Sequence, residues 1–122
     1  MSRYTSEQIL ETVVKACDQK RAEDIMALDV RKVSLLADYF LICHGGSERQ
    51  IKAIVDEVVE QVEKIGGTVK RVEGKEGGKW ILIDLGDVIV HVFSESERSF
   101  YNLEKLWSDA PLVDLSKWLI EE

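Results

Sequence analysis

The alternation of apolar and polar positions is clearest between Trp80 and Phe93, where two apolar runs flank a Gly86-Asp87 turn. This pattern predicts two antiparallel strands, because a two-residue loop pairs the residues on either side of it. Side chains alternate between the two faces of a strand. One predicted face, the aliphatic face, suits a protein core and consists of Ile81, Ile83, Leu85, Val88, Val90 and Val92.

The opposite face of this hairpin, the aromatic face, is apolar but also carries polar groups. Its cross-strand pairs are Trp80 with Phe93, Leu82 with His91, and Asp84 with Ile89. A sheet needs only one buried face. A second apolar face therefore indicates a covering helix or a partner protein, and aromatic clusters are typical anchors of protein interfaces. The pattern alone leaves both interpretations open.

Helical periodicity appears in three further places. Thr5 and Gln8 form a capping box that opens a helix to about Lys20. Ser47 opens a second helix, which the pair Gly66-Gly67 ends. A third helix is predicted to start at Ser94 and to include Phe100, Tyr101, Leu103, Leu106 and Trp107.

The remaining apolar runs predict three more strands, at Asp24–Val30, Tyr39–Cys43 and Thr68–Val72. The dense run at 39–43 is typical of a central strand buried on both faces. The order of elements predicts an α/β fold of the α+β type, with a mixed five-stranded sheet flanked by helices. The 122 residues suit one domain, 1–122, which ends in a short amphipathic segment after Pro111.

Composition narrows the class of partner. The formal net charge is -7, whereas nucleic-acid binders are usually basic, so DNA is not an expected partner. No apolar run approaches the ~20 residues of a membrane span. Cys17 and Cys43 lack metal-site spacing and fit a reducing compartment as small core residues. We therefore expect a cytoplasmic protein with a basic partner or with none.

The segment His44-Gly45-Gly46-Ser47 lies between a predicted strand and a helix N-terminus, where backbone N–H groups can bind phosphate. It resembles the Gly-Gly-Ser turn of nucleotidyltransferases. Those enzymes also need clustered carboxylates for Mg²⁺, and the predicted strand Thr68–Val72 carries none. A tight turn with a helix cap is the favoured interpretation, and a nucleotide-binding protein or degenerate nucleotidyltransferase is the alternative.

Isolated polar residues have structural explanations. His91 lacks a second His or Cys nearby and is expected to bond a neighbour such as Asp84 rather than to act in catalysis. Asp84 needs a cation, either Arg98 or one from a partner. Asp38 is expected to cap local backbone or to pair with Lys or Arg.

The Gly-rich and Lys-rich loop at 74–79 matches no phosphate-binding motif and is interpreted as a mobile loop. Its two lysines, Lys75 and Lys79, can contact RNA phosphate near a partner, although this is weak support for an RNA contact.

Three long blocks, residues 37–54, 80–93 and 100–110, together resemble the ribosomal silencing factor family RsfS, also called Iojap. The resemblance implies a nucleotidyltransferase-like fold without catalytic carboxylates, hence no enzyme, metal or cofactor. It implies binding to the large ribosomal subunit through its fourteenth protein, which blocks small-subunit joining and represses translation when nutrients are limiting. It also implies a possible homodimer.

The resemblance is firm to about residue 110 and leaves the role of 111–122 open. Carried onto this sequence, it places partner-binding residues on the aromatic face and in the third helix, and also at Leu85, which alternation assigns to the aliphatic face. With Phe93 from the aromatic cluster, the predicted set is Trp80, Leu82, Asp84, Leu85, His91, Phe93 and Tyr101.

Overall fold

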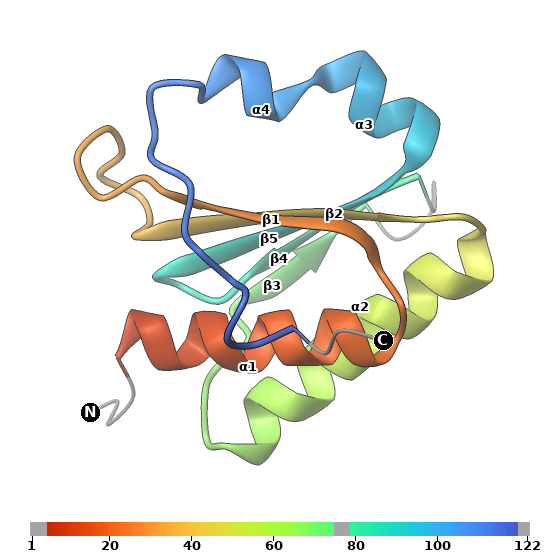
Figure 1. Ribbon diagram of the computed structural model, residues 1–122. Helices are drawn as coiled ribbons and strands as arrows, with labels where there is room; N and C mark the ends of the chain where they lie inside the picture. Colours follow the sequence, from red (N-terminus) through yellow and green to blue (C-terminus); the bar gives the residue numbers. More distant parts are fainter. Residues whose placement is uncertain (1–4, 75–78, 120–122) are drawn as a thin grey trace.

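The computed structural model describes residues 5–74 and 79–119. One five-stranded sheet forms the centre of the molecule, in the order β1-β2-β5-β4-β3 (Figure 1). β2 and β5 are parallel and the other neighbours are antiparallel, so the predicted mixed sheet is confirmed. The strands are β1 Glu23–Asp29, β2 Tyr39–Gly45, β3 Arg71–Glu73, β4 Trp80–Asp84 and β5 Val88–Ser94.

Helices cover both faces of the sheet (Figure 1). α1 (Ser6–Gln19) and α2 (Glu48–Lys64) lie against one face, and α3 (Glu95–Tyr101) and α4 (Leu103–Leu106) lie across the other. We call the second pair the α3–α4 layer. Among the described helices, none is long and apolar enough to cross a bilayer.

The β4–β5 hairpin has the predicted register. Trp80 lies opposite Phe93, and the Leu85 N–H donates to the Val88 carbonyl at 3.0 Å beside the turn. All six side chains of the aliphatic face are buried in the core against α1 and α2. β2 is buried along its whole length, as predicted for a central strand, because it lies between β1 and β5.

The predicted third helix is divided in two. Asn102 adopts a left-handed backbone conformation, with φ 47°, and so ends α3. Its side-chain oxygen then accepts from the Lys105 N–H and caps α4. Asn tolerates this conformation better than most residues, which allows the chain to change direction between the two helices.

The start of one predicted strand needs correction. β3 begins at Arg71 rather than Thr68, although the Lys70 N–H already donates to the Asp84 carbonyl at 2.8 Å. Residues 111–119 form no regular helix, but Leu115 and Trp118 are buried against the aliphatic side of the core. Most of the predicted loop at 74–79, including Lys75, falls outside the described residues.

Candidate functional site

Strand pairing gathers the predicted aromatic cluster on one face of the sheet. The ring centroids of Trp80 and Phe93 are 5.0 Å apart, and those of Trp80 and Tyr101 are 4.5 Å apart. Trp80 and Phe93 meet because they are cross-strand neighbours, whereas Tyr101 is brought in by α3. The hairpin and the first helix of the α3–α4 layer together build this surface.

His91 supports the Trp80 indole from below. The Trp80 Nε1–H donates to His91 Nδ1 at 3.2 Å, so Nδ1 is an acceptor and the ring proton lies on Nε2. Burial lowers the pKa of His91 to about 4, which keeps the imidazole neutral at physiological pH. His91 does bond a neighbour, as expected, but the neighbour is Trp80 rather than Asp84, whose carboxylate bonds the Gly86 N–H and lies near Arg71.

Asp84 is held at the turn rather than by Arg98. Its Oδ1 accepts the Gly86 N–H at 2.9 Å, and its Oδ2 lies 3.4 Å from Nε of Arg71 on the neighbouring strand β3. The expected pairing with Arg98 is therefore wrong. The side chain remains 19% exposed, so its charge reaches solvent at the end of β4 opposite to Trp80.

The seven predicted docking residues divide into exposed and buried groups. Tyr101 is 44% exposed, and Trp80, Leu82 and Asp84 are half-buried. We call these four residues the docking surface, because they are the accessible part of the predicted partner-binding set. The other three are almost fully buried: His91 and Phe93 lie beneath Trp80, and Leu85 lies in the core on the aliphatic face.

The sequence pattern left open whether a helix or a partner covers the aromatic face, and the structure shows that helices cover only part of it. The α3–α4 layer covers part of the aromatic face, where Trp107 packs edge-on against Phe40 with ring centroids 5.0 Å apart. The β4 portion keeps partly accessible side chains at Trp80 and Leu82. Leu85, which alternation assigned to the core and the family resemblance to the surface, lies in the core.

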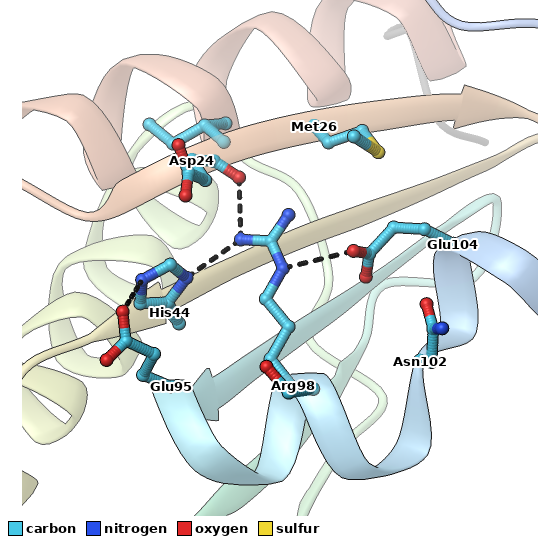
Figure 2. Close-up of a pocket in the computed structure, with 9 residues that line it drawn as sticks. Asp24, Met26, His44, Glu95, Arg98, Asn102 and Glu104 are labelled. Carbon is cyan, nitrogen blue, oxygen red and sulfur yellow. Dashed lines mark hydrogen bonds and ion pairs between the residues drawn. The ribbon is translucent and has the colours of Figure 1, made fainter.

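A cluster of polar side chains that the sequence analysis did not predict lies between α3 and the sheet (Figure 2). Nη1 of Arg98 lies 2.9 Å from His44 Nδ1 and donates to the Asp24 carbonyl at 2.8 Å, while Nε lies 3.4 Å from a Glu104 carboxylate oxygen. We call this set of contacts the Arg98 clasp. Arg98 and His44 are buried, with 8% and 4% of their surfaces exposed.

The clasp borders a polar pocket of about 590 Å³. Acidic side chains outnumber basic ones in its lining, with Asp24, Glu95 and Glu104 beside Arg98. Within the described residues, no group of three or more His, Cys, Asp or Glu side chains could hold a metal ion. This lining disfavours phosphate and other anions.

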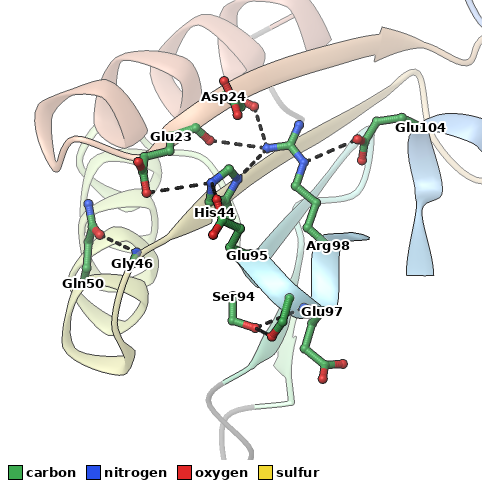
Figure 3. Close-up of polar contacts among 11 residues, drawn as sticks. Glu23, Asp24, His44, Gly46, Gln50, Ser94, Glu95, Glu97, Arg98 and Glu104 are labelled. Carbon is green, nitrogen blue, oxygen red and sulfur yellow. Dashed lines mark hydrogen bonds and ion pairs between the residues drawn. The ribbon is translucent and has the colours of Figure 1, made fainter. Parts of the chain in front are cut away.

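The Gly45-Gly46-Ser47 turn is hydrogen-bonded to Gln50 of α2, and Figure 3 shows the bond from Gly46. The Gly46 N–H donates to Gln50 Oε1 at 2.7 Å, and the Gln50 N–H donates to Ser47 Oγ at 3.1 Å. The pocket beside the turn contains Glu23, Glu48 and Glu95 against Lys79. The occupied Gly46 N–H and the nearby carboxylates disfavour a nucleotide at this turn, which caps α2 through Ser47 as expected.

The remaining candidates are structural. Cys17 and Cys43 are buried free thiols with sulfur atoms 4.0 Å apart, so the prediction of core residues is confirmed. The hydrogen bond with Cys43, together with burial, raises the pKa of the Cys17 thiol and suppresses its reactivity. Asp38 accepts from Ser6 Oγ at 2.8 Å, a partner that neither expectation named.

Comparison with known proteins identifies the class to which this fold and surface belong. A solved structure from Bacillus halodurans has 50% sequence identity and a TM-score of 0.80, and the match covers 89% of this chain and 99% of that one. This likeness establishes a shared α+β fold with a mixed sheet. A family model described as "Ribosomal silencing factor during starvation" matches residues 3–122.

The chain belongs to the ribosomal silencing factor family, RsfS. "Ribosomal silencing factor RsfS" of Bacillus subtilis is 59% identical over 107 residues, which cover 88% of this chain and 91% of the relative. "Protein Iojap, chloroplastic" of Zea mays is 35% identical over 104 residues, covering 85% of this chain and 45% of that protein. The predicted RsfS and Iojap resemblance is confirmed.

Proposed function

We propose that this protein binds the large ribosomal subunit in the cytoplasm through that subunit's fourteenth protein and blocks joining of the small subunit. The result is repression of translation when nutrients are limiting. The chain acts by occupying a surface and carries out no chemistry. The family match supports a ribosomal role, and the docking surface supplies the physical means.

The observation that carries the proposal is the partly exposed aromatic pair Trp80 and Tyr101 above a buried support. Their ring centroids lie 4.5 Å apart, and the indole is fixed by its hydrogen bond to His91. Large aromatic side chains held in one orientation lose little entropy on binding, which is why they dominate interface energetics.

Charge favours the same type of partner. The chain carries a formal net charge of -7, and Asp84 places a carboxylate within the docking surface. An acidic surface is attracted to a basic ribosomal protein and repelled by bare RNA phosphates. The contact with ribosomal RNA is therefore peripheral.

Subunit sedimentation tests this function. Purified small and large subunits are mixed in joining buffer with and without the protein, and the fractions are probed for it. The proposal predicts fewer joined ribosomes and migration of the protein with the large subunit. Unchanged joining at saturating protein, or migration with the small subunit, contradicts it.

The docking surface is also available to a second copy of the chain, so a homodimer would compete with ribosome binding. Light scattering over a range of protein concentrations measures this association. If the dimer uses the docking surface, Trp80→Ala shifts the equilibrium to monomer. An unchanged dimer fraction in that variant assigns self-association to another surface.

A further inference from the structure

We infer that Arg98 is the positioning residue of the docking surface. Its guanidinium fixes the orientation of α3, and this orientation sets Tyr101 against Trp80. The inference rests on the proposed function, because it concerns the affinity of the same surface. It adds a buried residue that contacts no partner and still controls how tightly the partner binds.

The first step is that α3 needs an anchor. The helix has seven residues, and helices this short are not stable in isolation. Among its described side chains Arg98 alone is buried, whereas Tyr101 remains 44% exposed. A buried arginine thus occupies the position at which a short amphipathic helix would usually place an apolar anchor.

The second step is the reach of this anchor. From α3, the Arg98 guanidinium contacts three other elements: the Asp24 carbonyl of β1, His44 of β2 and Glu104 of α4 (Figures 2 and 3). The planar fork of an arginine fixes direction as well as distance, which a single point charge does not. The clasp therefore restricts rotation of α3 about its own axis.

The third step is that the local backbone is shaped to receive the guanidinium. The β1–β2 register shifts between Glu23 and Met26, and Asp24 has a positive φ of 48°. Nη1 of Arg98 lies 2.8 Å from the Asp24 carbonyl and 3.4 Å from that of Glu23. A bulge of this kind re-aims backbone groups, here onto one arginine.

The fourth step fixes the role of His44. A guanidinium has no acceptor, so His44 Nδ1 must accept from Arg98, and the neutral ring carries its proton on Nε2. Nε2 faces carboxylates of Glu23 and Glu95 at 3.8 and 3.9 Å. Negative charge near Nε2 favours a proton on that nitrogen, which is the tautomer that the clasp needs.

The last step connects the clasp to the docking surface. Arg98 and Tyr101 are three residues apart, so they are neighbours on the helix surface. Arg98 reaches toward β1 and β2, and Tyr101 packs on Trp80 of β4. If α3 rotates, Tyr101 leaves Trp80 and the docking surface loses its shape.

The test combines binding with a local structural signal. Affinity for purified large subunits is measured for wild type, Arg98→Met and Trp80→Ala. Arg49→Met is the control, since it removes the same charge from an exposed site on α2. We expect Arg98→Met to weaken binding by about tenfold or more, and Arg49→Met to stay within about twofold of wild type.

The local signal is the indole N–H resonance of each tryptophan in the free protein. In Arg98→Met, the Trp80 signal should shift or broaden, while Trp118, packed against the opposite face, keeps its position. A variant that merely loosens the whole fold would move both signals. If Arg98→Met does not fold, Glu104→Gln, which removes one charge from the clasp, replaces it and should show the same pattern more weakly.

The outcomes separate the inference from the proposed function. Wild-type affinity and an unchanged Trp80 signal in a folded Arg98→Met or Glu104→Gln variant overturn the inference alone, provided that Trp80→Ala binds weakly. Wild-type affinity of Trp80→Ala overturns the docking surface, and the inference with it. Weak binding of Arg98→Met together with a displaced Trp80 signal supports both.

Discussion

The two faces of the sheet are both covered by helices, but they are built from different chemistry. The aliphatic face packs against α1 and α2, two long helices with continuous apolar stripes. The aromatic face meets two short helices, held by aromatic contacts and by a buried arginine. Because side chains alternate along β4 and β5, each residue on the aliphatic face is followed by one on the aromatic face.

This difference suggests separate roles for the two faces: the aliphatic face stabilises the fold, and the aromatic face is proposed to bind the partner. The side chains of an apolar core are closely packed and shielded from water, so they contribute mainly to folding stability. On the aromatic face, the side chains of Trp80 and Leu82 are only half-buried. A hydrogen bond to His91 orients the Trp80 indole. Substitutions on one face should therefore change the free energy of unfolding, and those on the other should change ribosome affinity.

The largest expected effect comes from the aliphatic face. Ile83 is fully buried, so Ile83→Ala should lower the free energy of unfolding by about 2–5 kcal/mol. Leu82, the adjacent residue on the other face, is half-buried, and Leu82→Ala should cost about 1 kcal/mol or less. Urea titrations measure both values. Equal losses for the two variants would remove the contrast between the faces.

The next effect concerns pH. Burial lowers the folded-state pKa of His91 from its usual 6.5 to about 4, so the unfolded chain binds more protons in this window. The resulting stability is fully present above pH 6.5 and is lost as the pH falls toward 4. It amounts to at most about 3 kcal/mol.

His91→Gln isolates this contribution, because glutamine cannot titrate but can still accept a bond from the Trp80 indole. Urea titrations at several pH values between 4 and 7 should give a shallower loss of stability for the variant than for wild type. Identical slopes would show that His91 has an ordinary pKa and is not desolvated.

The smallest effect comes from the charge in the docking surface. Asp84→Asn preserves an acceptor for the Gly86 N–H and removes the carboxylate. Because rim charges act mainly on association, large-subunit binding should slow by roughly two- to fivefold at low salt. Stopped-flow association rates test this, and the control is Glu60→Gln, at an exposed position of α2. An equal slowing in both variants would point to net charge alone.

Local rules predicted much of the fold. The hairpin register follows from a two-residue turn and alternation, and the central position of β2 follows from its unbroken apolar run. The division of α3 from α4 was missed because it depends on one left-handed residue, Asn102, within an otherwise helical pattern. Local periodicity does not reveal such a break.

The site was only partly predictable for a related reason. Trp80, His91 and Phe93 were grouped correctly because they lie on paired strands. The Arg98 clasp joins residues up to 74 positions apart in sequence, so spacing does not reveal it. One signal was available: His44 directly follows the dense apolar run 39–43, and a buried polar ring at that position needs a partner.

The most direct measurement of the central claim is large-subunit binding by Trp80→Ala, with Leu112→Ala as the matched control. Leu112 is 67% exposed and bridges to β1, at the sheet edge away from β4. The account predicts that folded Trp80→Ala loses about tenfold or more in affinity and no longer blocks subunit joining. It predicts wild-type behaviour for Leu112→Ala. Wild-type affinity of a folded Trp80→Ala variant would contradict the docking surface.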